Sequence, residues 1–133
     1  MAIERILIVE DNVALEGRPL ARKVEQAGYE VVGIAETGKD AVEMALRERP
    51  SVVLMDIELV DAEGKKDRLA GLRAAREIRS ATGAQVIFIT GILAERDVLS
   101  EAQRSPDYEF LIKPVKGPQL LASIRLAIAR TKR

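Results

Sequence analysis

The chain has 133 residues, and 47% of them are hydrophobic, which suits one domain that buries its own core. Its 21 basic and 21 acidic residues cancel, so no net charge directs it to nucleic acid or to an anionic membrane. It contains neither cysteine nor histidine, which excludes disulfides, thiol nucleophiles and imidazole sites, so any phosphohistidine in its chemistry belongs to a partner.

The first part of the chain combines an apolar run with an interrupted helical pattern. Residues 3–9 predict a buried strand, and the N-terminus enters it with no stretch long enough for a signal peptide or membrane span. We therefore expect a soluble, cytoplasmic protein. Residues 13–27 have helical spacing that Gly17 and Pro19 interrupt, so we expect a bent or late-starting helix that ends at Gly28. The positions expected to face the core are Leu15, Leu20, Val24 and Ala27.

The next elements lead to the middle of the chain. Residues 29–35 predict a short strand, and residues 39–48 predict a helix that begins after Thr37. Residues 51–56 are an apolar run that predicts a central strand, buried on both faces, which stops on Asp56. The inward positions expected for the helix are Ala41, Val42, Ala45 and Leu46.

The second half continues the alternation of strands and helices, and the pattern predicts an α/β fold. Five strands and five helices in this order favour a flavodoxin-like (βα)5 domain, a doubly wound five-stranded parallel sheet with helices on both faces. We expect residues 1–133 to form this single domain. In order, the elements after Asp56 are a solvated charged loop at 61–70, a helix at about 72–82, strands at 85–90 and 108–112 on either side of a short helix at 95–103, and a last amphipathic helix at 117–131.

Polar residues stand where four of these strands end. Because the carboxyl ends of parallel strands lie on one edge of a sheet, we expect their side chains to converge in one shallow pocket. Each alone has a plain interpretation as a helix cap, a strand threonine or a surface charge, and only their joint occurrence is specific. They are Glu10 and Asp11 after the first strand, Asp56 at the end of the third, Thr90 at the end of the fourth, and Lys113 with Pro114 after the fifth.

Such a set of side chains favours phosphoryl transfer. Neighbouring carboxylates raise a pKa unless a divalent cation relieves them, and an open all-oxygen site suits magnesium. The ammonium of Lys113 and the hydroxyl of Thr90 can then hold the remaining phosphoryl oxygens. Asp56, at the centre, is the natural nucleophile, since carboxylates form acyl phosphates.

The chain resembles the receiver domains of two-component response regulators along essentially its whole length. The resemblance rests on Glu10-Asp11, Met55-Asp56-Ile57, Thr90-Gly91 and Lys113-Pro114, in this order. It implies that Asp56 accepts a phosphoryl group from a histidine kinase or a histidine phosphotransfer protein. It further implies Mg²⁺ (or Mn²⁺) held by Asp11, Asp56 and the backbone carbonyl of Glu58, with Glu10 acting through water. Thr90 and Lys113 would contact the phosphoryl oxygens, and Lys113-Pro114 would be a cis peptide bond.

The resemblance also implies a conformational switch. Thr90 would move toward the phosphoryl group, and Phe110, which stands three residues before Lys113, would rotate inward behind it. The output surface would comprise the helix at 95–103, the strand at 108–112 and the last helix, and it would bind a downstream protein. Such a domain is no conventional enzyme but catalyses its own aspartyl phosphorylation and dephosphorylation, as a monomer or a phosphorylation-dependent dimer.

Some residues depart from the family pattern. Gly71-Leu72 comes later after Asp56 than usual, which indicates an insertion at 61–70, and Val60 and Val115 replace a common proline and phenylalanine. We expect a solvated insertion. A second hypothesis is that its basic residues form a lip over the site that selects a partner or slows hydrolysis, and another is that Glu58 influences water attack on the acyl phosphate. The basic residues are Lys65, Lys66 and Arg68.

Two other functions stay open at this point. One is a phosphorylation-silent adaptor that uses the fold only for binding, against which the complete acidic, threonine and lysine set argues. The other is a receiver cut from a longer regulator or hybrid kinase rather than a stand-alone single-domain regulator. The basic C-terminal residues 130–133 are more simply a favourable charge at a helix end than a nucleic-acid contact, so we expect no nucleic-acid partner.

Overall fold

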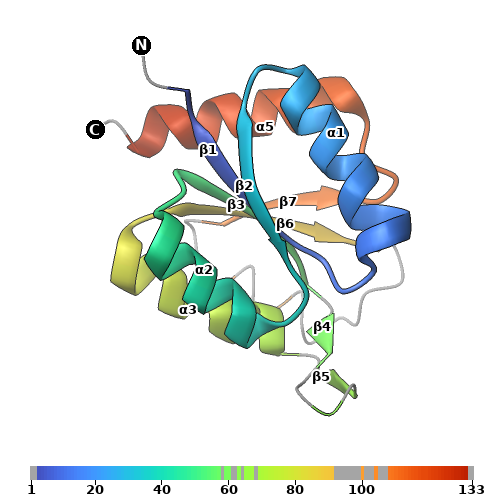
Figure 1. The fold of residues 1–133 in the computed structure, drawn as a ribbon, viewed down its shortest axis with the longest axis vertical. Helices are drawn as coiled ribbons and strands as arrows, with labels where there is room; N and C mark the ends of the chain where they lie inside the picture. The colour runs from blue at the N-terminus through green and yellow to red at the C-terminus, as the bar shows by residue number, and fades with distance from the viewer. Residues whose placement is uncertain are drawn as a thin grey trace.

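In the computed structural model, the chain forms a five-stranded parallel sheet between two layers of helices (Figure 1). The structure describes residues 3–57, 59–60, 63, 65–67, 69–91, 100, 104 and 108–131. The strand order β2-β1-β3-β6-β7 is that of the flavodoxin-like folds, so the predicted fold is confirmed. The strands are β1 (Arg5–Val9), β2 (Glu30–Ala35), β3 (Val52–Asp56), β6 (Gln85–Thr90) and β7 (Glu109–Ile112).

Two hydrophobic cores hold the helices to the sheet. Helices α1 (Arg18–Gln26) and α5 (Gly117–Thr131) cover one face, and α2 (Gly38–Glu48) and α3 (Ala70–Thr82) cover the other (Figure 1). Side chains of the central strand alternate between the two cores: Leu54 faces α1 and α5, whereas Met55 faces α2 and α3. All of β3 is buried, as its unbroken apolar sequence predicts.

The first helix starts late, as Gly17 and Pro19 predict. A π-helical turn, η1 (Val13–Gly17), precedes α1, and Pro19 lies in the first turn of α1, where its missing N–H is tolerated. Leu15, in the π-helical turn, is 77% exposed, so its predicted inward position is wrong. The cause is the turn itself, which changes the helical spacing on which that prediction was based. Ala27 is also exposed, because it lies beyond the last turn of α1.

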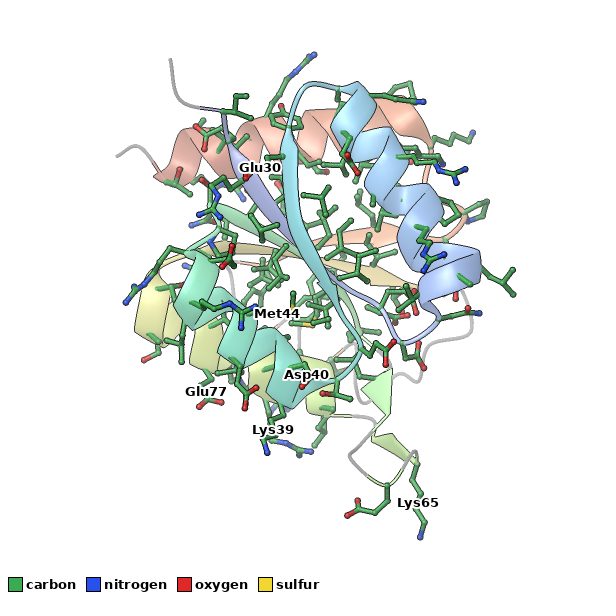
Figure 2. All side chains as sticks on the ribbon, in the orientation of Figure 1. Glu30, Lys39, Asp40, Met44, Lys65 and Glu77 are labelled. Atoms are coloured by element: carbon green, nitrogen blue, oxygen red, sulfur yellow. The ribbon has the colours of Figure 1, made fainter. Side chains whose placement is uncertain are left out.

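The predicted inward face of α2 is wrong at one position. Ala41 and Ala45 are buried, but Leu46 is 46% exposed. Met44 takes the remaining inward position and occupies the place that a Cβ at Gly33 on β2 would need (Figure 2). The flexible thioether side chain thus fills the space over a glycine. The inward face is centred on Ala41, Met44 and Ala45, and Leu46, about 100° further round the helix than Ala45, lies outside it.

The charged segment after Asp56 forms a hairpin rather than the predicted loop. Strands β4 (Leu59–Val60) and β5 (Lys66–Asp67) pair antiparallel and project from the body of the domain (Figure 1). Leu59 is fully buried against the core beneath α3 and anchors the hairpin. Lys65, at the tip, points away from the domain, so the prediction of a solvated insertion is confirmed at this residue (Figure 2).

The last two points concern the helices: one predicted helix, most of which the structure does not describe, and the length of those that it does. Most of the helix predicted at 95–103 lies outside the described residues, so it stays a prediction. Among the residues that the structure does describe, no helix has the length and apolar content needed to cross a membrane.

Candidate functional site

The strand register brings the predicted site residues to one edge of the sheet. Val9 pairs with Met55, and Asp56 pairs with Ile89, so the segment that follows β1 and the last residue of β3 lie side by side. The ladders continue past the strand ends. The Ile57 N–H donates to the Ile89 carbonyl at 3.2 Å. The Lys113 N–H donates to the Thr90 carbonyl at 2.8 Å, which brings Lys113 level with the end of β6.

Three carboxylates meet at this edge. Oxygens of Glu10, Asp11 and Asp56 all lie within 4.8 Å of one another. Glu10 is only 4% exposed and Asp56 only 8%, whereas Asp11 faces solvent. Three carboxylates at this spacing suit a hard divalent cation such as Mg²⁺, which takes oxygen ligands and retains water on its open side.

The electrostatics of Glu10 show how costly this cluster is. Burial raises the pKa of Glu10 to about 8, and its hydrogen bond with Asp11 and the nearby charge of Asp56 act in the same direction. The N–H of Asn12, which donates to Glu10 Oε2 at 3.0 Å, opposes the rise. Without a cation, the cluster therefore tends to take up a proton.

Lys113 supplies the opposite charge. Its Nζ lies 3.1 Å from Asp56 Oδ2, 3.4 Å from Glu10 Oε1 and 2.8 Å from Glu16 Oε1. Burial by itself lowers the pKa of Lys113, but the hydrogen bond with Glu16 and the charges of Asp56 and Glu10 outweigh it and raise the pKa above its usual value. The lysine is thus charged, and it contacts Asp56, the carboxylate that the sequence predicts as nucleophile.

Thr90 and Phe110 share one face of the sheet. Thr90 is 2% exposed, and its hydroxyl donates to the Gly91 carbonyl at 3.3 Å. Phe110 is half-buried and stacks on Phe88, its partner in the β6–β7 register, with ring centroids 5.4 Å apart. Thr90 follows Phe88 by two residues and therefore faces the same side as both rings. Tyr108 meets Phe88 edge to face at 5.1 Å.

The start of α3 packs directly on the backbone of the candidate nucleophile. A Cβ at Gly71 would come within 2.9 Å of the carbonyl oxygens of both Asp56 and Ile57. Only glycine allows this approach, because an unrelieved contact of that length is strongly repulsive. Gly71 therefore fixes how the segment after β3 leaves the sheet.

A cavity of about 450 Å³ opens beside the carboxylates. Asp56 and Lys113 border it, and apolar side chains from the start of α1 and from the segment after β7 form much of its wall. Its apolar lining residues are Val9, Leu15, Pro19, Leu20, Leu54, Ile89, Pro114 and Val115. Asp56 is therefore reached through a partly apolar opening.

Most of the predicted site residues are brought together, and the predicted cis peptide Lys113-Pro114 is confirmed. Glu58 lies outside the described residues, as do the side chains of Lys66 and Arg68, so the predictions that rest on them remain predictions. Sequence reasoning missed Glu16, which follows no strand. The only signal in the sequence was the break in helical spacing at Gly17. It predicted irregular backbone there, but not which side chain would point toward the site.

A family model described as the response regulator receiver domain matches residues 6–125. The chain is 36% identical over 126 residues to the transcriptional regulatory protein PdtaR of Mycobacterium tuberculosis, with coverage of 95% of this chain and 57% of PdtaR. It is 35% identical over 131 residues to the response regulator MprA of Mycobacterium leprae, covering 96% of this chain and 52% of MprA. The chain thus spans little more than half the length of these relatives.

Solved structures give the same result at the level of the fold. The signal receiver domain of a modulated diguanylate cyclase from Desulfovibrio desulfuricans G20 has a TM-score of 0.86 and 32% identity, over 98% of each chain. The response regulator domain of Thermotoga maritima CheB has a TM-score of 0.78 and 29% identity, over 96% of this chain and 98% of that one.

Proposed function

Since this chain belongs to the receiver domains of response regulators, the phosphorylatable modules of two-component signalling, we propose that Asp56 is the residue that accepts the phosphoryl group. The observation that carries this assignment is the 3.1 Å contact between Lys113 Nζ and Asp56 Oδ2 within the three-carboxylate cluster. Among the carboxylates of the described residues, Asp56 combines burial, a place at the end of the central strand and a contact with a charged lysine.

The transfer balances with the groups present. A carboxylate oxygen of Asp56 attacks phosphorus, the new O–P bond forms, and the N–P bond to the donor histidine breaks, leaving the imidazole to the partner. Lys113 neutralises charge on the transferring oxygens, and Thr90 offers its hydroxyl to one of them. In the later dephosphorylation, which is a separate reaction, water attacks the phosphorus and the O–P bond to Asp56 breaks, which returns the Asp56 carboxylate and releases inorganic phosphate.

Receiver domains bind Mg²⁺ at an acidic pocket, and the oxygen cluster of this chain fits that ion. We propose that Asp11 and Asp56 hold it directly, with the carbonyl of Glu58, that Glu10 acts through water, and that Mn²⁺ can replace it. When bound, the ion neutralises the carboxylates and the charge of the phosphoryl oxygens.

Receiver domains interact with histidine kinases or phosphotransfer proteins. We propose that such a partner contacts the apolar wall of the cavity, where Leu15 is exposed at the rim and Pro114 lies close to Lys113. A partner docked there brings a phosphohistidine within reach of Asp56. A cytoplasmic location, the absence of a nucleic-acid partner and a single domain over residues 1–133 are further proposals.

The switch is proposed from the shared face of Thr90 and Phe110. Movement of the Thr90 hydroxyl toward the phosphoryl group vacates space beside Phe88, and Phe110, which has no hydroxyl, follows by packing alone. The proposed output surface comprises β7, α5 and the segment before β7, where a downstream protein or a second copy of the chain would bind.

The test is intact mass after incubation with phosphoramidate and Mg²⁺. We expect one phosphoryl adduct in the wild-type protein and none in Asp56→Ala or in the presence of a chelator. No adduct in folded protein that binds Mg²⁺ and is offered a histidine kinase would reject the assignment and favour a phosphorylation-silent adaptor.

A further inference from the structure

Glu16 is a fourth acid at the site, and it differs from the other three. Among the described residues, the carboxylates close enough to share a cation are Glu10, Asp11 and Asp56. Glu16 contacts Lys113 instead, and its 2.8 Å distance is the shortest of the three that this ammonium makes with carboxylates. Its side chain is 42% exposed, so it stands at the mouth of the site rather than within it.

The π-helical turn η1 holds Glu16 in this position. The N–H of Gly17 donates to the Asn12 carbonyl, five residues earlier, at 3.0 Å, which is the wide turn of a π-helix, and the N–H of Glu16 donates to the same carbonyl at 3.0 Å. Gly17 is buried, and a Cβ there would lie 3.1 Å from Ile34 Cγ2 and 3.7 Å from Glu10 Cγ. Because Gly17 has no side chain, the turn packs closely against β2 and Glu10. This packing places the carboxylate of the preceding residue, Glu16, next to Lys113.

This geometry sets two anions in competition for one ammonium. In the proposed function, Lys113 must contact phosphoryl oxygens on Asp56, and it has to leave or share its contact with Glu16 to do so. Neutralisation of the other carboxylates by a cation does not remove this contact, because Glu16 lies outside their cluster. The negative charge of Glu16 also stands close to the place where the phosphoryl group adds negative charge.

We propose that Glu16 is a positioning residue that retains the Lys113 ammonium in the unphosphorylated state and competes with the phosphoryl group for it. Glu16 thereby lowers the affinity of the site for a phosphoryl group and biases the domain toward the inactive state. The proposal deepens the function proposed above and depends on it. It assigns to a residue with no place in the strand-end motifs a part in setting how readily this receiver is phosphorylated.

The test uses beryllofluoride, a non-covalent phosphoryl analogue, at saturating Mg²⁺. Binding to the wild-type protein, Glu16→Gln, Glu16→Asp and Glu25→Gln is followed by NMR of backbone amides. Glu25, exposed on α1, supplies the same change of charge away from Lys113. We expect Glu16→Gln to bind the analogue about threefold to tenfold more tightly, as for a half-exposed ion pair, with Glu16→Asp intermediate and Glu25→Gln unchanged.

A second measurement separates positioning from simple repulsion. The ¹³Cε and ¹⁵Nζ signals of Lys113 in the unphosphorylated protein should shift in Glu16→Gln and stay in place in Glu25→Gln. Tighter binding without that shift would overturn the positioning role, and so would unchanged binding in Glu16→Gln. If wild-type protein binds Mg²⁺ but neither beryllofluoride nor a phosphoryl group, the proposed function fails, and this inference fails with it.

Discussion

Charged side chains lie at both ends of the parallel strands, the amino edge and the carboxyl edge of the sheet, but they are arranged in opposite ways. At the amino edge, Arg5 forms ion pairs with Glu30 at 3.2 Å and with Glu48 at 2.9 Å. It also donates a hydrogen bond to the Glu48 carbonyl at the end of α2. At the carboxyl edge, one ammonium faces Glu10, Glu16 and Asp56, and Asp11 stands beside them. Because Arg47 also pairs with Glu48, at 3.3 Å, the first edge has one cation for each of these two carboxylates, whereas the second has an excess of negative charge that a cation or a proton must relieve.

The contrast separates what stabilises the domain from what makes it reactive. The amino edge links β1, β2 and the end of α2 in the folded state. The carboxyl edge accepts unfavourable repulsion to keep buried carboxylates close together, and that repulsion is available to favour the binding of a cation. Predictions that change one edge at a time can test this division.

The largest expected effect comes from Gly71→Ala, which acts on the carboxyl edge through the backbone. The added methyl group meets the carbonyls of Asp56 and Ile57, so we expect a loss of about 2 to 3 kcal/mol in the free energy of unfolding. Phosphorylation by phosphoramidate should slow at least about tenfold, since Asp56 is displaced. Urea unfolding and intact mass measure the two effects. Gly117→Ala, where a Cβ meets nothing within 4 Å, is the control, and an equal loss there would contradict the argument.

The second prediction uses pH to expose the strain at the carboxyl edge. Because the pKa of Glu10 is raised from 4.5 to about 8 in the folded protein, the folded state binds more protons than the unfolded state between these values. The contribution of Glu10 to stability is therefore present below about pH 4.5 and is lost as the pH rises toward 8. In chelator, Glu10→Gln should remove about 1 to 2 kcal/mol of that decline. Identical pH profiles of the two proteins in urea unfolding would refute this prediction.

The third prediction breaks the amino edge. Arg5→Ala removes the guanidinium that pairs with Glu30, one of the two that pair with the Glu48 carboxylate, and the donor to the last carbonyl of α2, so we expect a loss of about 1 to 2 kcal/mol in the free energy of unfolding. The rate of phosphorylation should not change, because Arg5 lies at the opposite edge of the sheet from Asp56. Arg22→Ala, at an exposed position of α1, is the matched control in urea unfolding. A slower phosphorylation of folded Arg5→Ala would show that the two edges are coupled.

The smallest expected effect has the opposite sign. Asp11→Asn removes one negative charge next to Glu10, so in chelator we expect a gain of about 0.5 to 1 kcal/mol in the free energy of unfolding. The same change should weaken Mg²⁺ binding about tenfold or more, measured by calorimetry. Stability that falls in chelator, as it does for Arg5→Ala, would mean that the carboxyl edge is not strained.

The strands and their polar ends could be predicted from the sequence because they depend on local rules. A buried parallel strand needs an unbroken apolar run, and topology then brings Glu10, Asp56, Thr90 and Lys113 together whatever the details of packing. These residues need only to be last in their strands, or just after them, to meet.

The features that escaped prediction depend on contacts between distant segments. The inward face of α2 includes Met44, which fills the space over Gly33, a residue of another element, and leaves Leu46 outside it. Strand β5 of the hairpin, Lys66–Asp67, is composed of charged residues with little strand preference, and its partner strand β4 is held by the burial of Leu59 beneath α3. The contact of Glu16 with Lys113 depends on a π-helical turn, which no spacing rule predicts.

The aromatic residues of β6 and β7 make the proposed switch visible to spectroscopy. The chain has no tryptophan, two tyrosines and two phenylalanines, and Tyr108, Phe88 and Phe110 form one contiguous stack. Tyr29 is the only other aromatic residue, so Tyr29→Phe leaves a single phenol in the protein. The near-ultraviolet circular dichroism of the Tyr108 phenol then reports on the geometry of that stack. The ring-current shifts of the methyl groups around Phe88 report on the same geometry. Tyr108 can therefore serve as an intrinsic spectroscopic probe, close to Phe110, the residue proposed to move.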